Sequence, residues 1–239
     1  MTFCIAIKVN EGLLALADTE IVKGDERVTR SKLSTVNDDH QSWWLMTSGL
    51  RSIRDKAVTY LEQDLIHCVN PDQQLFELAN RFGHALRRVR SEDGESLARS
   101  GLAFNLHAIL GGQLPGDPEP KLFYLYPEGN WIETSVDSPY FIVGRTYYAK
   151  PILDRLLTFE TPLKYAASLA FLAFDMTRTS VHDVDFPIDF LVAESGRGSM
   201  RQHRYARCDL ENISSWWNDT LCKALENFPS NSFDELFLV

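Results

Sequence analysis

The sequence is poor in positive charge: 24 lysines and arginines stand against 33 aspartates and glutamates, and the formal net charge is −9 at pH 7. Nucleic-acid binding requires a concentrated positive field, so nucleic acid is not expected as the main partner. The one dense basic cluster, residues 87–90, is followed closely by acidic residues, which favours a solvated helix face.

Long apolar runs and metal-binding spacings are also missing. No apolar run approaches the ~20 residues that a membrane span needs. The four cysteines, at positions 4, 68, 208 and 222, form no Cys-x-x-Cys pair and no zinc spacing with the histidines. We expect buried free thiols in a reducing compartment. No secretory leader precedes the first apolar segment. Together these absences predict a cytoplasmic protein without a metal, a cofactor or a membrane partner.

What the sequence does contain is an apolar segment directly after its second residue. Residues 3–9 are typical of a strand, residues 10–12 of a tight turn, and residues 13–17 of the returning strand of a hairpin. If Met1 is removed, Thr2 carries a hydroxyl and a free α-amine on one residue. An α-amine titrates near ~7.7–8.0, so it can act as general base for the hydroxyl beside it. Thr2 is therefore a candidate nucleophile.

Two charged residues strengthen this interpretation. Asp18 ends the second strand, and Lys32 lies fourteen positions further along the chain. A nearby ammonium lowers the pKa of a hydroxyl because it favours the charged form, and a carboxylate keeps that ammonium in place. The hairpin predicts Thr2 and Asp18 at its open end, within reach of Lys32. The alternative is that Asp18 caps a strand end and Lys32 is a surface lysine.

The order of elements predicts an α+β fold. Further strands are expected at 31–36, 41–48, 101–112, 121–126, 130–134, 140–143, 187–194 and 200–206. Helices are expected at about 50–69, from Asn70-Pro71-Asp72 past Leu86, and at about 146–158, 162–178 and 209–227. Helices come in adjacent pairs, which excludes a doubly wound parallel sheet. The pattern favours a four-layer αββα sandwich, in which two antiparallel sheets lie between helices, as a single domain over residues 1–239.

Three local patterns allow narrower predictions. The polar stretch from Thr19 to Arg30 is typical of a loop. Gly111-Gly112 lacks the spacing of a phosphate-binding loop, so a turn at a strand end is expected there. The tryptophan pairs at 43–44 and 216–217 are compatible either with the core or with subunit contacts, where aromatic residues are enriched.

Several longer stretches resemble a known family. MTFCIAIKVNEGLLALADTE, with Lys32 in SKL and the SGL at 48–50, resembles proteasome-type peptidases of the N-terminal nucleophile hydrolase superfamily. Within it, GRTYYAKPILDRLL (144–157) and DMTRTSVHDVDFPIDFLV (175–192) look like blocks of the bacterial ancestral β-subunit family, called Anbu. These two blocks separate Anbu-like chains from other proteasome relatives. The resemblance covers most of the chain and implies a homo-oligomeric ring or open ring.

The resemblance assigns roles to four residues. Thr2 matches the nucleophile that becomes the first residue after removal of Met1. Asp18 matches the carboxylate that partners the lysine, and Lys32 the lysine that tunes the hydroxyl. Gly49 matches the glycine whose backbone N–H forms the oxyanion hole, a donor typically worth ~3–4 kcal/mol of transition-state stabilisation.

The family also has a supporting acid and hydroxyl pair in a later loop. Asp175 with Thr179 or Ser180 lies in the matching block, in a register that the sequence leaves open. The small residue expected after the glycine of the 144–157 block is Arg145 here. Glu20 stands where the family often has a positive charge, and next to a cleft it is expected to disfavour acidic substrate side chains.

The resulting hypothesis is a threonine peptidase that acts on peptides or unfolded protein. A ring-forming scaffold with weak or no turnover, and a small-amide hydrolase of the same superfamily, remain as alternatives. The sequence has no ATP-binding motif, so any energy dependence requires a separate ATP-dependent unfoldase.

Overall fold

The structure is a computed structural model that describes residues 2–23, 26–37, 41–66, 74–196, 200–229, 233 and 235–237. The chain divides into two compact units, residues 1–205 and residues 206–239. The expectation of a single domain over the whole chain stays a prediction. In the described residues, all strands and every α-helix except the last lie in the first unit.

The first sheet is antiparallel and has five strands in the order β10-β1-β2-β11-β12. Its strands are β1 (Phe3–Val9), β2 (Gly12–Asp18), β10 (Tyr140–Gly144), β11 (Ile188–Glu194) and β12 (Met200–Tyr205). β1 and β2 form the predicted hairpin, with Cys4 opposite Ala17. Every residue of both strands is buried, which explains why both are apolar apart from Lys8 and Asp18.

The second sheet is also antiparallel, in the order β5-β6-β7-β8-β9. Its strands are β5 (Leu33–Asn37), β6 (Ser42–Gly49), β7 (Leu106–Gln113), β8 (Lys121–Leu125) and β9 (Trp131–Glu133). The interior between the two sheets is filled by alternate residues of their strands, such as Ala6, Trp44 and Ile109. A side-chain period of two puts the neighbouring residues on the outer faces.

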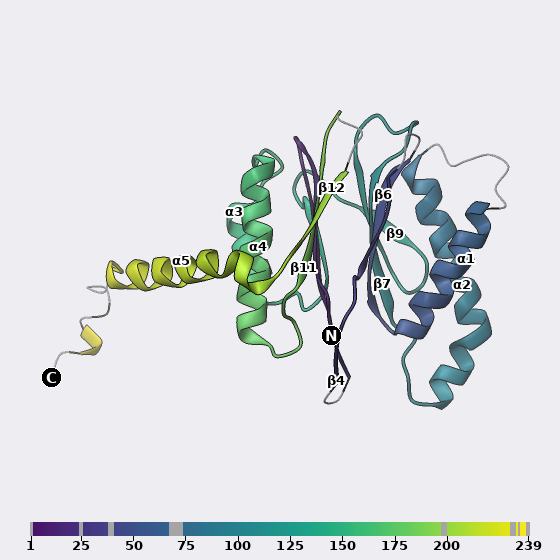
Figure 1. The fold of residues 1–239 in the computed structure, drawn as a ribbon, viewed down its shortest axis with the longest axis horizontal. Helices are drawn as coiled ribbons and strands as arrows, with labels where there is room; N and C mark the ends of the chain where they lie inside the picture. Colours follow the sequence, from purple (N-terminus) through teal and green to yellow (C-terminus); the bar gives the residue numbers. More distant parts are fainter. Residues whose placement is uncertain are drawn as a thin grey trace. The chain divides into compact units, whose positions relative to one another are not determined.

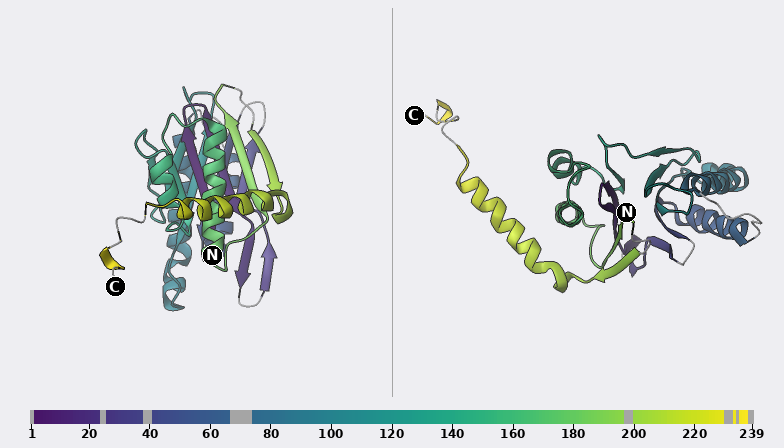
Figure 2. Two further views of the ribbon diagram at one scale, coloured as in Figure 1. Left: turned by 90° about the vertical axis from the view of Figure 1, so that its left-hand side faces the viewer. Right: turned by 90° about the horizontal axis from the view of Figure 1, so that it is seen from above.

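Helices cover the outer face of each sheet. Figure 1 and Figure 2 show α3 (Lys150–Leu156) and α4 (Leu163–Ser180) against the first sheet, and α1 (Arg51–Ile66) and α2 (Leu75–Arg99) against the second. The contact with the first sheet includes the rings of Phe3 and Phe174, whose centroids are 6.1 Å apart. The predicted α+β fold with a four-layer αββα arrangement is confirmed.

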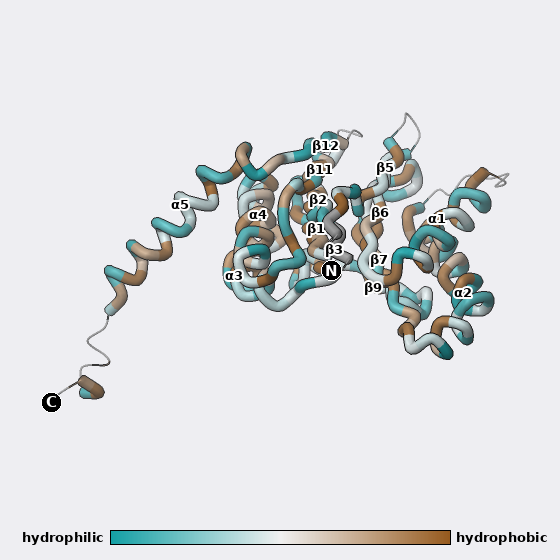
Figure 3. Tube along the Cα trace, turned by 60° about the horizontal axis from the view of Figure 1, so that its bottom comes forward, coloured by the Kyte–Doolittle hydropathy of each residue, from teal (hydrophilic) through white to brown (hydrophobic). Residues whose placement is uncertain are grey.

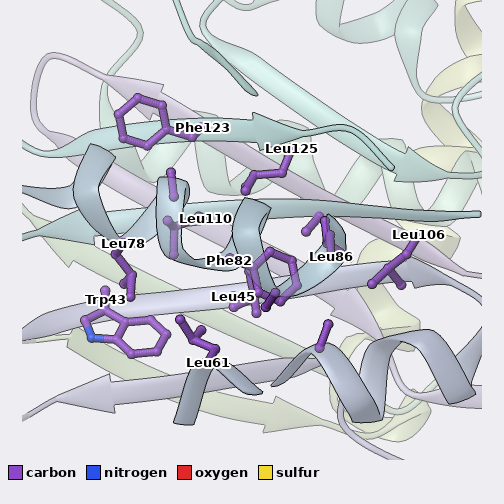
Figure 4. Close-up of a cluster of buried hydrophobic side chains, with 14 of the residues drawn as sticks. Trp43, Leu45, Leu61, Leu78, Phe82, Leu86, Leu106, Leu110, Phe123 and Leu125 are labelled. Atoms are coloured by element: carbon purple, nitrogen blue, oxygen red, sulfur yellow. The ribbon is translucent and has the colours of Figure 1, made fainter. Parts of the chain in front are cut away.

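The core between the second sheet and its helices is apolar. Figure 4 shows side chains from α1 and α2 meeting those of the sheet, among them Phe82, Trp43 and Leu110. Phe82 is 1% exposed and Leu110 is also 1% exposed. Burial of such side chains typically stabilises a fold by ~1.5–3 kcal/mol each, so this cluster is a main source of stability.

Some elements differ from the sequence-based expectation. β3 (Glu20–Lys23) pairs antiparallel with β4 (Glu26–Thr29) within the stretch where a loop was predicted. Backbone pairing of two strands needs no apolar pattern, so composition gave no signal for it.

β7 begins at Leu106, later than expected, and runs through Gly111 and Gly112 without a turn. A Cβ on Gly111 would lie 2.2 Å from the Trp44 ring, so the glycine makes room for that side chain. The predicted helix start at Asn70-Pro71 lies outside the described residues.

The second unit consists mainly of α5 (Arg207–Glu226). Hydrophobic and hydrophilic residues alternate along this helix (Figure 3), and none of its residues is buried. Trp216 is 57% exposed, whereas Trp43 and Trp44 belong to the core. The first pair therefore follows the core alternative, whereas a role of Trp216 in subunit contacts stays a prediction. Buried thiols were expected throughout, but only Cys4 is buried, while Cys208 and Cys222 are exposed and Cys68 lies outside the described residues.

Candidate active site

A cleft of about 640 Å³ opens at Thr2. Thr2, Lys32 and Gly49, three of the four residues expected to act directly in catalysis, line it. The chain start lies at the end of the sandwich from which β3 and β4 project (Figure 1). The fourth residue, Asp18, is fully buried and contacts Lys32 rather than the cleft itself.

Main-chain contacts on both sides hold Thr2. Its carbonyl oxygen accepts a hydrogen bond of 2.8 Å from the backbone N–H of Arg145. The next amide, the N–H of Phe3, donates to Asp18 Oδ1 at 2.7 Å. Gly144 allows the close approach, because its φ is +93° and a Cβ there would lie 1.8 Å from the Thr2 oxygen. The sequence block around residue 144 therefore helps to set the position of the candidate nucleophile.

Asp18 and Lys32 form a buried ion pair. Lys32 Nζ donates to both carboxylate oxygens of Asp18, at 2.6 and 2.7 Å, and to the carbonyl oxygen of Glu20 at 2.8 Å. Lys32 is 8% exposed. The predicted contact is present, and the alternative of a surface lysine does not hold. Asp18 thus links the backbone beside Thr2 to the ammonium of the cleft.

Burial has the largest effect on the pKa of Asp18. Desolvation raises the pKa of its carboxyl to about 6, although the charge and hydrogen bonds of Lys32 and the Phe3 N–H act in the opposite direction. The carboxylate that pairs with Lys32 is therefore the main species at pH 7 and is lost below pH 6.

Gly49 ends β6 at the rim of the cleft. Its φ is +138°, and a Cβ would lie 2.0 Å from the carbonyl oxygen of Asn105. A side chain cannot be accommodated there, so only main-chain atoms of residue 49 border the cleft. The assignment of its N–H to an oxyanion hole stays a prediction.

A second buried acid near the cleft was missed by the sequence reasoning. Ser31, which lines the cleft, donates from its hydroxyl to Asp189 Oδ2 at 2.7 Å. Asp189 is 1% exposed and also accepts two hydrogen bonds from Arg204, at 2.6 and 2.8 Å. Ser31 and Asp189 are far apart in sequence, and the only available signal was the Pro-Ile-Asp block itself.

A third acid, Asp183, is connected to Thr2 through Arg145. The Arg145 guanidinium donates to Asp183 at 3.2 and 2.8 Å, while its backbone binds the Thr2 carbonyl. Partial burial would raise the pKa of Asp183, but the hydrogen bonds from Arg145 outweigh it and hold that pKa below its ordinary value. The residue that departs from the family pattern, Arg145, is therefore paired with an acid of the 175–192 block.

The expected supporting residues Asp175, Thr179 and Ser180 are not brought to the cleft. Asp175 pairs with Arg178 on α4, at 2.7 Å. The hydroxyls of Thr179 and Ser180 donate to carbonyl oxygens four residues earlier, at 2.7 and 3.0 Å. Residues up to 180 are still helical, so the register proposed from the sequence falls too early. Asp183, which follows the helix, is the acid of this block that connects to Thr2.

Glu20 also differs from the expectation. Its residue is 8% exposed, and it is not part of the described lining of the cleft. Its contribution is the carbonyl oxygen that accepts from Lys32. The effect of its side chain on acidic substrates stays a prediction.

His107 is a further residue of the cleft that the sequence did not single out. Its Nδ1 lies 3.0 Å from the Tyr124 hydroxyl. Burial lowers the pKa of the imidazole, with a smaller opposing effect of Glu128, so the ring is neutral at pH 7.

The described residues offer neither a metal-binding cluster nor a membrane-spanning helix. The described part of the chain contains no group of three or more histidine, cysteine, aspartate or glutamate residues that could hold a metal ion. Among the helices of the described residues, none combines the length and the apolar character needed to cross a membrane.

Several solved structures share this fold over nearly the whole chain. Anbu from Hyphomicrobium sp. strain MC1 is 30% identical, with a TM-score of 0.86 over 95% of this chain and 98% of that one. Anbu (ancestral β-subunit) from Yersinia bercovieri is 27% identical, with a TM-score of 0.87 over 95% and 98%. A helical assembly of the Anbu complex from Pseudomonas aeruginosa is 28% identical, with a TM-score of 0.88 over 96% and 98%. No protein-family model and no curated protein matches the chain.

The αββα fold is that of the proteasome-like N-terminal nucleophile hydrolases. Within this class, a mutant form of the Hyphomicrobium protein reaches 31% identity, with 98% of its chain covered. The chain belongs to the Anbu (ancestral β-subunit) family. The predicted family is confirmed.

Proposed function

We propose that the chain is a self-assembling threonine peptidase or amidohydrolase that uses Thr2 as its nucleophile after removal of Met1. The observation that carries the proposal is the position of Asp18. Its carboxylate accepts from the amide next to Thr2 and from Lys32, which lines the same cleft as Thr2.

The proposed reaction proceeds through an acyl-enzyme. The α-amine of Thr2, directly or through a water, accepts the proton of the Thr2 hydroxyl, and the oxygen attacks the substrate carbonyl. Lys32 favours the ionised hydroxyl by its charge, and Asp18 fixes Lys32. The backbone N–H of Gly49 donates to the developing oxyanion. The amine leaving group takes a proton, and water then hydrolyses the ester to regenerate Thr2.

Removal of the nucleophile tests the proposal. Thr2→Ala is expected to abolish turnover of a peptide panel, because the alternative hydroxyls of the cleft lack an adjacent α-amine. Thr59→Ala, on the exposed side of α1, is the matched control and should retain activity. Mutant turnover equal to that of the wild type would refute the assignment.

Intact mass measures the state of the chain start. We expect the purified protein to lack Met1 and to gain one adduct from a threonine-directed electrophile, with no adduct on Thr2→Ala. Retained Met1 and no labelling would favour the catalytically weak or inactive scaffold.

We also propose that the chain forms a homo-oligomeric ring or open ring. The helical assembly of the related Pseudomonas protein supports this. So does α5, which exposes Trp216, Leu221 and Leu225 to solvent by 57%, 48% and 74%. Large apolar side chains left exposed on one helix are typical of a subunit contact.

Sedimentation checks the assembly. The wild type is expected to sediment as an oligomer, and Trp216→Lys with Leu225→Lys as a smaller species with unchanged thermal stability. Lys223→Gln, on the same helix, is the control. A wild-type protein that is monomeric at all concentrations would contradict the assembly. Peptides or unfolded protein are the proposed substrates, and any use of folded substrates requires a separate ATP-dependent unfoldase.

A further inference from the structure

The cleft at Thr2 is basic, although the protein as a whole has a net charge of −9. Its lining includes Arg30, Lys32, Arg51 and Arg54, and none of its described lining residues is an aspartate or glutamate. The concentration of one sign of charge at this place requires an explanation, since acidic residues outnumber basic ones in the chain.

The neighbouring acids do not balance these charges. Asp18 neutralises Lys32 below the cleft. Arg51 and Arg54 share a single carboxylate, that of Asp55, at 3.2 and 2.7 Å. The guanidinium of Arg30 has no ion-pair or hydrogen-bond partner within the described parts of the chain. Among the side chains that the structure describes, the three arginines of the lining thus contact one carboxylate, that of Asp55, and the surplus positive charge belongs to these arginines.

The local structure adds to this field. α1 begins at Arg51, and its first turn contains no acidic residue. The N-terminal end of a helix carries a partial positive charge and unpaired N–H groups, which favour an anion. The side chain of Arg54 is only 24% exposed, so its charge is less screened than that of a surface arginine. His107, across the cleft, is neutral and does not change the balance.

Guanidinium groups match one ligand geometry especially well. Two of their N–H groups donate in parallel to the two oxygens of a carboxylate. A peptide offers a carboxylate in two ways: as an aspartate or glutamate side chain, or as its free carboxyl terminus. Both would be held at the rim of the same cleft in which Thr2 lies.

We infer that the Arg30, Arg51 and Arg54 side of the cleft binds a substrate carboxylate and makes the protein selective for peptides that present one there. This inference rests on the proposed function for the identity of the reaction, but the binding site itself does not require turnover. It reverses the expectation drawn from Glu20, whose side chain lies outside the described lining.

Binding to the full-length Thr2→Ala protein isolates recognition from catalysis. Three fluorescent peptides that differ only at the last residue serve as probes: one ends in glutamate with an amidated terminus, one in glutamine with an amidated terminus, and one in glutamine with a free terminus. Fluorescence anisotropy is expected to give about tenfold tighter binding of a carboxylate-bearing peptide than of the neutral one, weakened by added salt. Whichever of the two carboxylate peptides is preferred identifies the source of the carboxylate.

Arginine variants assign the effect to the cleft. Arg54→Gln and Arg30→Gln, each added to Thr2→Ala, are expected to remove most of the preference without weakening the neutral peptide. Arg99→Gln removes the same charge at the exposed end of α2 and should leave the preference unchanged. Circular dichroism melting confirms that each variant is folded.

Two results would overturn the inference: equal or tighter binding of the neutral peptide, or a preference that survives in the combined Arg30→Gln and Arg54→Gln variant. Measuring peptide turnover by the wild-type protein distinguishes failure of this inference from failure of the proposed function. Cleavage without a preference for carboxylate-bearing peptides sinks the inference alone, whereas an intact binding preference without any cleavage sinks the peptidase and keeps the carboxylate site.

Discussion

The two sheets of the sandwich differ in what they bury. In the second sheet, no described strand residue that is buried is polar or charged, and its contact with α1 and α2 is apolar. The first sheet buries Lys8, Asp18 and Asp189 within its strands. Each is paired: Lys8 with Glu119 at 2.9 Å, Asp18 with Lys32 at 2.6 Å and Asp189 with Arg204 at 2.6 Å.

Buried apolar and buried charged side chains contribute differently to the stability of the fold and to the geometry of the site. Buried charges contribute little net stability even when they are paired, because desolvation offsets the attraction. They do, however, fix orientation, since an unpaired alternative is costly. Apolar burial in both sheets is therefore the main source of folding free energy, and Asp18 and Asp189 of the first sheet set the arrangement of the cleft.

The largest effect is expected from Asp18→Asn, which leaves the buried ammonium of Lys32 without its carboxylate. The free energy of unfolding should fall by about 3–5 kcal/mol and peptide turnover by at least ~100-fold, as measured by urea denaturation and kinetics. Adding Lys32→Met should restore most of the stability but none of the turnover. A double variant as unstable as the single one would show that this pair is a source of stability after all.

Phe82→Ala tests the apolar core between the second sheet and its helices. Phe82 is 1% exposed and lies in the helix layer over the second sheet. The free energy of unfolding is expected to fall by about 3–5 kcal/mol, as for other core phenylalanines. Turnover per folded molecule should stay within about twofold, and Ile132→Ala, at an exposed position, should change the stability by less than ~0.5 kcal/mol. A large loss of turnover in folded Phe82→Ala would mean that both sheets set the site.

Gly144→Ala tests the support of Thr2 by the main chain. A Cβ at residue 144 would meet the Thr2 carbonyl oxygen at 1.8 Å, so we expect a cost of about 1–3 kcal/mol and a clear loss of turnover. Gly101→Ala is the matched control, because φ is also positive there, at +71°, but nothing lies within 4 Å. The control should lose some stability and no activity. Equal activity in the Gly144→Ala and Gly101→Ala variants would argue against a role of this main-chain contact in positioning Thr2.

The smallest effect is a pH dependence centred on Asp18. Because its pKa is raised to about 6, turnover should fall about tenfold per pH unit below 6 as the carboxylate that holds Lys32 is protonated. The stability contribution has the opposite sign. A folded-state pKa above the ordinary value of 3.8 gives stability that is complete below 3.8 and is lost as the pH rises through 6. Turnover without an acidic limb near pH 6 would contradict this assignment of Asp18.

The comparison also explains what the sequence could predict. The apolar β1–β2 hairpin fixes both its register and the neighbourhood of Thr2 and Asp18, so local patterning was sufficient. Ser31 meets Asp189 only because β2 pairs with β11, a contact that no local pattern contains. Asp183 was missed for a similar reason, since its partner Arg145 lies 38 residues away.

The supporting residues were misplaced for a local reason. The sequence predicts a helix that ends at about residue 178, but α4 continues to Ser180, so Asp175, Thr179 and Ser180 all lie on the helix and not in the loop after it.

The double anchoring of the peptide unit after Thr2 has a practical consequence. Its carbonyl accepts from the Arg145 N–H and the next amide donates to Asp18 on the neighbouring strand, so the residues that hold this peptide unit all follow Thr2 in the sequence. An extension in front of Thr2 should therefore give a well-folded but latent protein. Trimming that extension would switch the amine from blocked to available without any rearrangement of the scaffold.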